Sequence, residues 1–439
     1  MRRVTHFGLC VLVGYAICML AGCGEQGKNG NASGVTDAGV SIEFWHYFSK
    51  DQETALKELL KQFETENPSI KVKAVFQSNP RELRQKLDGS FAASPSKNPV
   101  LSTLYESWTD DYLSRGLMDP VQGYFGGSDG LSTEEQDDIV KVFRDGNSWD
   151  GKMVTMPFNK SIYLYYLNMD RLGAVGITTS PKTQTEYAAA VQKCTLREDG
   201  RIKMYGLGIQ PRSEGLTTLL FARGGRYTDD SGKITLATPE AVASLALLKS
   251  LQSPEKNLYI NPDFLSVPFT NQQIAMYIYS SASLPYNSQG AAGKFKYEAA
   301  PVPAGDGAEP RYLIQGTNIG IFRNHPEAVR QAAWKLVKFL TSTKNSAYFE
   351  TRSGYMPIRY SILKDPQMAQ HLAKNPDYAV AASLVLSDKG RQEPRFAAWE
   401  GVRADLDSLV DTVLSKGTDP KQALDELQAK VDARLGKGK

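Results

Sequence analysis

The side chains best able to do chemistry in this sequence are spaced in ways that favour binding over catalysis. His46, His325 and His371 do not lie three or four residues from another histidine or from a cysteine, so a metal site has little support. No nucleophile elbow, zinc-protease motif, phosphate-binding loop or dinucleotide motif is present. The paired acids at 134–135 and 137–138 are typical of a solvated helix start. We expect a protein that is not an enzyme and that uses neither a cofactor nor a metal.

The first 23 residues have the pattern of a targeting signal. Arg2 and Arg3 precede an apolar run at 7–20, which is too short for a membrane span and ends in small residues. Leu20-Ala21-Gly22-Cys23 resembles the bacterial lipobox, in which the cysteine becomes the lipidated first residue. The alternative is an ordinary cleaved signal in which Cys23 has no special role. We expect an exported protein, anchored by lipid at Cys23 to a bacterial membrane and facing the periplasm.

Composition limits what the remainder can be. Residues 24–39 are polar and rich in glycine, so we expect a signal at 1–22 and a flexible tether at 23–40. The rest is too long for one ordinary core and suits two domains. The formal net charge is +3, of which Arg2 and Arg3 supply two, so no basic field favours nucleic acid. Cys194 is the one thiol beyond the signal and the lipidation site, and we expect it to be buried.

Two blocks of alternating strands and helices would have to position any site. The first is predicted to run strand, helix, strand, helix, strand, which implies a parallel sheet with crossover helices: 41–44, 51–66, 70–76, 81–93 and 100–105. Residues 152–168 indicate a strand, a bend and a second strand. The second block is predicted at 183–196, 205–209, 215–223, 239–251 and 274–279. A proline-rich crossing segment at 301–305 leads to a strand at 312–322, and helices are expected at 327–340, 345–351, 395–415 and 420–435.

Several segments resemble one family. They are Phe44-Trp45-His46, Phe63-Glu64-x-Glu66-Asn67-Pro68, Pro157-Phe158-Asn159-x-Ser161, Tyr165-Tyr166-x-Asn168-x-Asp170 and Ser353-Gly354-Tyr355-Met356-Pro357-Ile358. In this order they are similar to the extracellular solute-binding proteins of ABC importers, in the larger-lobed sugar-binding group. The resemblance covers residues 41–435 and is closest to the branch that binds glycerol 3-phosphate and glycerophosphodiesters.

The resemblance implies a two-lobed, periplasmic-binding-protein-like α/β fold with a cleft and crossing hinge strands. The first lobe would comprise 41–160 and 308–356, and the second lobe 161–307 and 357–439. A small-molecule ligand would bind at the carboxyl ends of strands and draw the lobes together. The partners implied are that ligand, an ABC permease and the membrane that holds the lipid. We expect a monomer.

The resemblance also implies ligand contacts on both sides of the cleft. Glu106 follows the strand 100–105, and its carboxylate could accept from two vicinal hydroxyls of a glycerol or sugar. A helix-capping or surface acid is the alternative. Ser161 would reach into the cleft from the crossing, unless it only forms a turn. Ser280 ends a strand and could offer its hydroxyl and free N–H groups to an oxyanion, a role compatible with a plain helix cap.

Three further contacts are implied in the last third of the chain. Gly316 lies within a strand, where it marks either close approach of the ligand to a backbone N–H or a bulge. Tyr355 matches a ligand-contacting tyrosine of the family, whereas a core tyrosine is the ordinary expectation. Arg403 matches the phosphate-binding arginine, in keeping with bidentate guanidinium chemistry, although a surface arginine is the alternative.

The sequence differs from the glycerol phosphate-binding branch at positions between the implied hydroxyl-binding and phosphate-binding ends of the site. Pro80 replaces a ligand-contacting tyrosine, and Pro211 and Glu214 replace two tryptophans, with Arg212 between them. Arg212 and Glu214 are therefore possible ligand contacts. Aromatic surface could come from other residues: Trp45, Trp108 and Tyr227. The alternatives to a glycerol phosphate binder are an oligosaccharide-binding protein of the same kind, an exported hydrolase and a surface adhesin.

Overall fold

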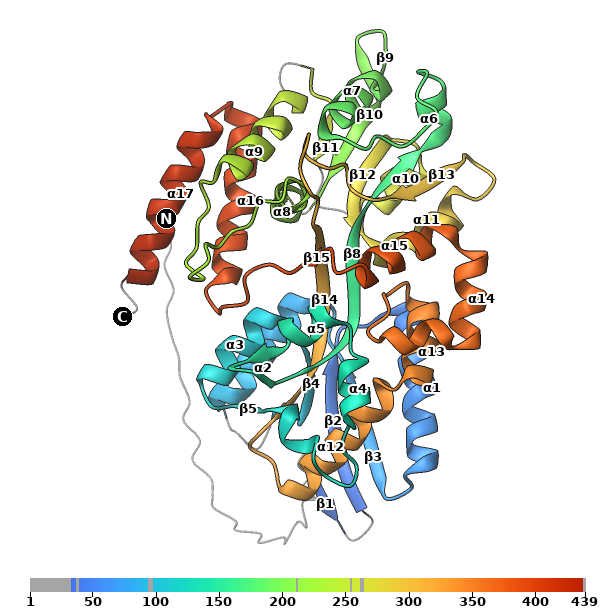
Figure 1. Cartoon of the computed structure of the whole chain (residues 1–439), viewed down its shortest axis with the longest axis vertical. Helices are drawn as coiled ribbons and strands as arrows, with labels where there is room; N and C mark the ends of the chain where they lie inside the picture. Colours follow the sequence, from blue (N-terminus) through green and yellow to red (C-terminus); the bar gives the residue numbers. More distant parts are fainter. Residues whose placement is uncertain are drawn as a thin grey trace, which may run out of the picture. The chain divides into compact units, whose positions relative to one another are not determined.

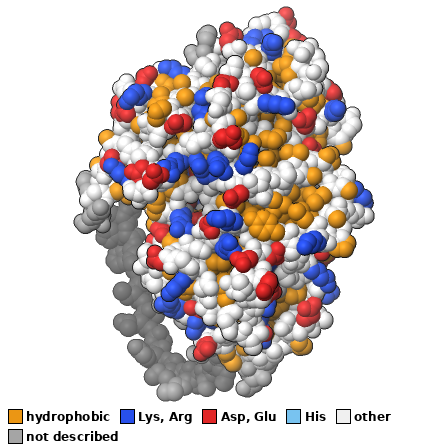
Figure 2. Space-filling view, viewed as in Figure 1, with side chains coloured by type: hydrophobic (Ala, Val, Ile, Leu, Met, Phe, Trp, Pro, Cys, Tyr) orange, Lys and Arg blue, Asp and Glu red, His pale blue; other side chains and the backbone are white. Residues whose placement is uncertain are grey.

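The computed structural model describes residues 33–36, 39–93, 98–210, 212–252, 255–260 and 264–436 (Figure 1). The predicted signal, the lipidation site Cys23 and Pro211 lie outside these residues. On the face drawn in Figure 2, basic side chains are interspersed with acidic ones and with apolar areas. This mixture agrees with the small net charge of +3.

The first strands and helices form near where the sequence predicts them, with one correction. Their bounds are β2 (Gly39–His46), α1 (Lys50–Glu66), β3 (Ile70–Phe76), α2 (Pro80–Ala93) and β4 (Leu101–Leu104). Residues 34–36 and 39–40 of the predicted flexible tether are strand residues, because β1 (Gly34–Thr36) pairs antiparallel with the start of β2. One face of α1 is buried, and Asn67 caps its end before Pro68, a residue that disfavours a helix. Strand β2 pairs in parallel with both β3 and β4, so the predicted parallel sheet is confirmed.

Short elements follow β4 before the chain reaches the long strands. They are α3 (Glu106–Ser114), β5 (Met118–Asp119), the 3₁₀ helix η2 (Val121–Tyr124), α4 (Thr133–Asp137), α5 (Lys141–Gly146), β6 (Ser148–Trp149) and β7 (Lys152–Met153). Helix α4 begins with a capping box in which Ser132 and Glu135 bond each other's backbone N–H groups. This pairing explains the acids near residue 134 as helix-start residues.

Two long strands run through the middle of the molecule and join its two halves (Figure 1). They are β8 (Met156–Asn168) and β14 (Tyr312–Phe322), which pair antiparallel. Strand β14 also pairs with β4, and β8 also pairs with β12 (Ile274–Ser280), so one sheet continues through both halves. The predicted strand, bend and second strand within 152–168 are confirmed, since β7 ends at Met153, the chain bends at Thr155 and β8 follows. Within β8, Pro157 lies at a shift of register beside Thr317 and Asn318.

The second half contains strands and helices around the parallel pair of β10 (Arg201–Ile209) and β12. The elements before β12 are α6 (Met169–Gly173), α7 (Gln184–Cys194), β9 (Leu196–Glu198), α8 (Arg212–Ala222), α9 (Pro239–Gln252), β11 (Leu258–Ile260) and α10 (Ser266–Thr270). The next are η3 (Ser281–Ser283), α11 (Leu284–Ala291) and β13 (Tyr297–Ala300). The predicted burial of Cys194 is confirmed, since the side chain is fully enclosed.

Helices make up most of the chain after β14. Helix α12 (Glu327–Leu340) packs under the first sheet, and α13 (Thr343–Ser353) packs against α1. The rest are η4 (Tyr360–Lys364), α14 (Pro366–Lys374), α15 (Pro376–Leu386), β15 (Gly390–Arg391), α16 (Trp399–Lys416) and α17 (Pro420–Gly436). Helix α16 packs against α8 and α17 in the second half. Separate hydrophobic cores lie in the two halves, one around β10 and β12 and the other around β2 and α12.

Gly316 lies on β14 where the backbone of β8 passes close to it. Its φ of +102° is one that other residues rarely adopt, and a Cβ atom there would lie 2.0 Å from the carbonyl oxygen of Asn159 on β8. The packing of the two strands therefore accounts for glycine at this position, whatever contact its N–H makes with a ligand.

Replacing Gly316 should therefore destabilise the protein strongly. We predict that Gly316→Ala lowers the free energy of unfolding by about 3 kcal/mol or more, because backbone strain and a collision between strands add together. Gly417→Ala is the matched control, since Gly417 has a φ of +72° in open space and should cost only about 1 kcal/mol. Denaturant unfolding measures both. Equal losses would contradict the strand-packing explanation.

Candidate functional site

Glu106 is held in one orientation by three separate segments. It is the first residue of α3, directly beyond the carboxyl end of β4. Its Oε1 atom accepts hydrogen bonds from Lys160 Nζ at 2.6 Å, Gln392 Nε2 at 3.1 Å and Asn318 Nδ2 at 3.2 Å. Its Oε2 atom accepts none from the described residues. The carboxylate is therefore fixed through one oxygen while the other can accept a hydroxyl.

Lys160 is a residue of this site that the sequence reasoning missed. It lies on β8, its side chain is 0% exposed, and its Nζ also donates to the backbone oxygen of Gly316 at 3.3 Å. Burial lowers the pKa of Lys160, and the neighbouring Glu106 carboxylate acts in the opposite direction. A buried lysine needs such a partner. The available signal was a lysine beside Ser161 in a strand whose other side chains are mostly apolar.

Arg403 lies on the second turn of α16 and is surrounded by acids. Its guanidinium forms one ion pair with Glu214 of α8 and another with Glu393, whose Oε2 lies 3.5 Å from Nη1. Burial opposes the charge of Arg403, but the carboxylates of Glu393 and Glu214 outweigh it and raise the pKa of the guanidinium. Arg403 is therefore a fixed cation with two carboxylates already in contact.

Glu214 is the most perturbed acid of this group. Desolvation by burial raises its pKa to about 7, an effect that Arg403 reduces and Glu393 reinforces. The hydroxyl of Tyr163 on β8 donates to Oε2 of Glu214. Glu214 thus sits between a cation and a hydroxyl donor, at a position that the sequence comparison marked only as a possible ligand contact.

Glu106 and Arg403 face one small cavity. Its lining comes from α3, β14, the segment after β15 and the start of α16: Tyr105, Glu106, Ser107, Ile314, Gln315, Gln392, Glu393, Pro394, Trp399, Glu400 and Arg403. Its volume is about 20 Å³, which is room for about one water molecule. Two residues that the sequence placed on opposite sides of a cleft are therefore brought together around the same space.

Aromatic side chains enclose part of this cavity. Trp399 is buried, packs against Tyr227 with ring centroids 5.2 Å apart, and has an indole N–H without a hydrogen-bond partner among the described residues. Tyr105 packs edge-on against Trp108 at 5.1 Å. Trp399 was not among the expected contacts, although the sequence gave reason to look for replacement aromatic surface.

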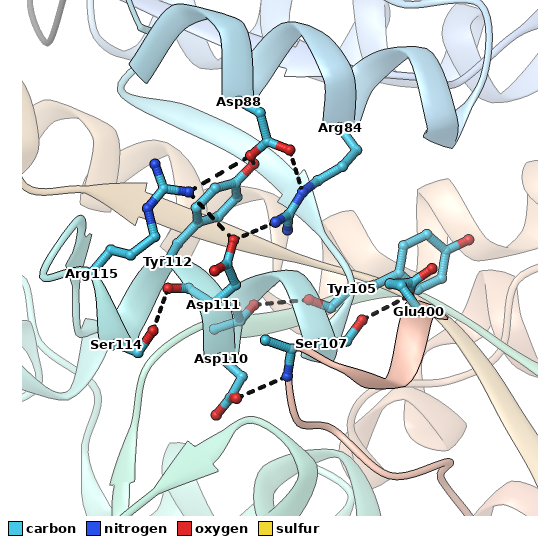
Figure 3. Close-up of polar contacts among 12 residues, drawn as sticks. Arg84, Asp88, Tyr105, Ser107, Asp110, Asp111, Tyr112, Ser114, Arg115 and Glu400 are labelled. Atoms are coloured by element: carbon cyan, nitrogen blue, oxygen red, sulfur yellow. Dashed lines mark hydrogen bonds and ion pairs between the residues drawn. The ribbon is translucent and has the colours of Figure 1, made fainter. Parts of the chain in front are cut away.

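The first turns of α3 and the start of α16 touch at the edge of the cavity (Figure 3). Ser107 Oγ donates to Glu400 at 2.7 Å, and the backbone N–H of Ala397 donates to Asp110 at 3.0 Å. Further along α3, Asp111 binds Arg84 and so ties α3 to α2. Helix α3, which makes these contacts with the start of α16, is thus itself held by α2.

The other predicted contacts do not line this cavity. Ser161 is buried on β8 opposite Gln315, and Ser280 caps η3 by accepting from the N–H of Ala282 at 3.2 Å. Tyr355 is buried against Phe349, with ring centroids 6.1 Å apart. Burial raises the pKa of Tyr355, and its hydroxyl interacts with Tyr47, which also interacts with Tyr105 in the cavity wall. Their ligand roles stay predictions.

Arg212 and Trp45 have partners away from the cavity. Arg212 forms an ion pair with Asp411 on α16. The indole N–H of Trp45 donates to Glu43 at 2.5 Å. Neither residue lines the cavity, so their roles as ligand contacts also stay predictions.

Among the residues that the structure describes, no group of three or more histidine, cysteine, aspartate or glutamate side chains could hold a metal ion. No helix in the described part of the chain is both long and apolar enough to cross a membrane.

Comparison with known proteins assigns the chain to a family. The sequence model of a family described as bacterial extracellular solute-binding protein matches residues 58–378. A putative binding protein of Brucella abortus is 27% identical over 97% of this chain and 98% of its own length. The sn-glycerol-3-phosphate-binding periplasmic protein UgpB of Salmonella typhimurium is 26% identical over 88% of this chain and 90% of its own. The resemblance seen in the sequence is confirmed.

Solved structures share the fold. UgpB from Mycobacterium tuberculosis, in complex with glycerophosphocholine, superposes with a TM-score of 0.80 at 22% identity and covers 91% of this chain and 99% of that protein. The GacH receptor of Streptomyces glaucescens, solved unliganded and with acarbose, has a TM-score of 0.75 at 20% identity and covers 90% and 97%. The predicted two-lobed, periplasmic-binding-protein-like α/β fold is confirmed.

The ion pair between Lys160 and Glu106 yields a stability prediction. Lys160→Met should cost about 3 kcal/mol in the free energy of unfolding, because it leaves a carboxylate partly buried and unpaired. Adding Glu106→Gln should recover part of this loss, since a neutral amide needs no cation. Lys421→Met is the control: Lys421 Nζ lies 2.5 Å from Asp425, and these two side chains are 67% and 49% exposed, so the loss should stay under about 1 kcal/mol. Equal losses in denaturant unfolding would show that burial of the pair is unimportant.

Proposed function

Because this chain belongs to the bacterial extracellular solute-binding protein family, we propose that it captures glycerol 3-phosphate or a glycerophosphodiester for an ABC importer. Members of this family bind small solutes outside the cell membrane and deliver them to a permease, and they are not enzymes. The observation that carries the choice of ligand is the meeting of Glu106 and Arg403 at one cavity. A relative named for glycerol 3-phosphate and a structural neighbour bound to glycerophosphocholine support it.

The two ends of the cavity suit the two ends of such a ligand. The Oε2 atom of Glu106 can accept from glycerol hydroxyls while its other oxygen stays bound to Lys160. Arg403 and the N–H of Trp399 can donate to phosphate oxygens on the opposite side. In this proposal Ser161 and Gly316 of the crossing strands, Ser280 at the end of β12 and Tyr355 after α13 join the site once the lobes separate enough to admit the ligand.

Ligand entry then requires the lobes to move. A cavity of about 20 Å³ cannot hold a glycerol phosphate, so Gln392, Glu393 and Arg403 must withdraw from Glu106. We place the first lobe at 41–160 and 308–356 and the second at 161–307 and 357–439, joined by β8 and β14. Hinge motion of this kind is a common response to ligands.

Closure of the two lobes around the ligand can be tested by X-ray scattering in solution. If the ligand binds the closed form better than the open one, saturating glycerophosphocholine should lower the radius of gyration of the soluble body. Small-angle X-ray scattering with and without ligand measures the change. An unchanged profile at a saturation confirmed by calorimetry would contradict closure.

The ligand assignment makes a second prediction. Arg403→Ala should weaken binding of glycerol 3-phosphate and glycerophosphocholine by about 30-fold or more, because loss of a desolvated charge partner costs about 2–5 kcal/mol. Arg434→Ala is the control, since Arg434 of α17 pairs with Asp405 of α16 but does not line the cavity. Glu106→Gln should weaken both glycerol ligands. Titration calorimetry measures all of these affinities, and a loss as large in Arg434→Ala would contradict the assignment.

One observation favours an oligosaccharide as the second candidate ligand. Glu106, Glu393 and Glu400 line the cavity, and Glu214 contacts Arg403, which is the one cation among the described lining residues. Such an excess of acceptors suits sugar hydroxyls. Tight binding of maltose that is insensitive to Arg403→Ala, with no heat from either phosphate ligand, would select this candidate.

We also propose that the protein is a monomer held by lipid at Cys23 on the periplasmic side of a bacterial membrane. The Leu-Ala-Gly-Cys sequence at 20–23 and the polar stretch after it support this proposal. A diacylglycerol supplies two chains, which is enough for stable attachment.

The anchor can be tested by one substitution. Cys23→Ser should release a soluble body that binds ligand with the affinity of the wild type, because the lipid is the only proposed link to the membrane. Fractionation and immunoblotting locate the protein. A correctly processed variant that stays wholly in the membrane fraction would contradict the anchor.

A further inference from the structure

Glu214 already forms an ion pair with Arg403, the residue that is proposed to bind phosphate. Its Oε1 forms the ion pair with Arg403, and its Oε2 accepts from the hydroxyl of Tyr163, so both oxygens have partners inside the protein. The Glu214 side chain is 12% exposed and comes from α8, whereas Arg403 comes from α16. Helices α8 and α16 pack against each other, so Glu214 stays within reach of the guanidinium however the two lobes move.

An anion arriving at Arg403 would meet an excess of negative charge. Glu393 contacts the same guanidinium at 3.5 Å, and Glu400 acts on it through space. Both carboxylates in contact with Arg403 are nearly buried, so water screens them little. A phosphate monoester carries about −1.5 to −2 near pH 7, whereas a phosphodiester carries one charge and a sugar none. The repulsion is therefore largest for the monoester.

We propose that Glu214 is a specificity-determining residue, which competes with the ligand for Arg403 and so makes the site reject phosphate monoesters in favour of phosphodiesters. This inference rests on the proposed function, because it assumes a glycerol phosphate ligand at Arg403. It deepens that function by separating the two ligands that were proposed together. Discrimination of this kind comes from a repulsive group as much as from an attractive one.

Because Glu214 and the ligand compete for Arg403, the affinity for an anionic ligand depends on whether Glu214 is protonated. Protonated Glu214 is neutral and competes less for Arg403, so acid conditions favour an anionic ligand. The groups around Glu214 are Arg403 and Asp407 of α16, Glu393 after β15, Tyr163 of β8, Tyr279 of β12, and Tyr105 before α3. With the pKa of Glu214 at about 7, affinity for a phosphodiester should fall as pH rises above 7, by at most about tenfold per unit.

Calorimetry with glycerol 3-phosphate and glycerophosphocholine tests the inference in the whole protein, released from its lipid anchor. The wild type should prefer the diester. Glu214→Gln keeps the size of the side chain and removes its charge, so it should bind the monoester about tenfold or more tightly than the wild type, with a smaller gain for the diester. The fall in affinity between pH 7 and pH 8 should also flatten. Glu58→Gln, an exposed glutamate on α1, is the control and should change neither ratio nor pH dependence.

A second variant keeps the test valid if Glu214→Gln fails to fold. Glu393→Gln removes the other contacting carboxylate and should shift the preference in the same direction. An unchanged ratio of monoester to diester affinity in both folded variants would overturn the role of Glu214 while leaving the proposed function intact. If neither phosphate ligand bound to the wild type or to any variant, the proposed function and this inference would fall together.

Discussion

The buried ion pair between Glu106 and Lys160 is the interaction on which the arrangement of the site depends. Removing both charges from water is costly, and the cost is offset only where further hydrogen bonds satisfy the groups. Here Asn318 and Gln392 supply donors to the carboxylate, and the backbone of Gly316 accepts from the ammonium. The pair therefore fixes the start of α3 against both crossing strands and against the segment that carries Glu393.

At the opposite end of the cavity, the charge of one arginine is balanced by two carboxylates of the protein. Arg403 cannot lose its proton, and its neighbours Glu214 and Glu393 neutralise it within the protein. Any anionic ligand must replace these contacts, so its affinity is a difference between two similar interactions. Such a difference is sensitive to ligand charge, whereas the Glu106 end is sensitive to hydroxyl groups. The Arg403 end of the cavity therefore selects for the charge of the ligand, and the Glu106 end selects for its hydroxyl groups.

Much of the fold could be predicted because local patterns agreed with tertiary structure. The apolar stripe of α1 ends at Asn67-Pro68, and the bounds of β3, β14 and α12 follow from periodicity alone. The shift of register at Pro157 could not be predicted, because it depends on Thr317 and Asn318 of the partner strand β14. Lys160 was missed for a related reason: a lysine normally indicates solvent, and its acid partner lies 54 residues away. Gln392 and Glu393 belong to a segment without regular periodicity, so only the folded chain brings them to Glu106 and Arg403.

In the proposed complex, Glu106 and Arg403 bind opposite ends of one ligand between the lobes. A crystal structure of the protein, released from its lipid anchor and bound to glycerophosphocholine, would show whether they do. We expect the glycerol hydroxyls on Glu106 Oε2, the Lys160 contact retained, and the phosphate on Arg403 with Glu214 displaced from the guanidinium. A ligand bound with the Arg403–Glu214 pair intact and Glu106 untouched would contradict this arrangement.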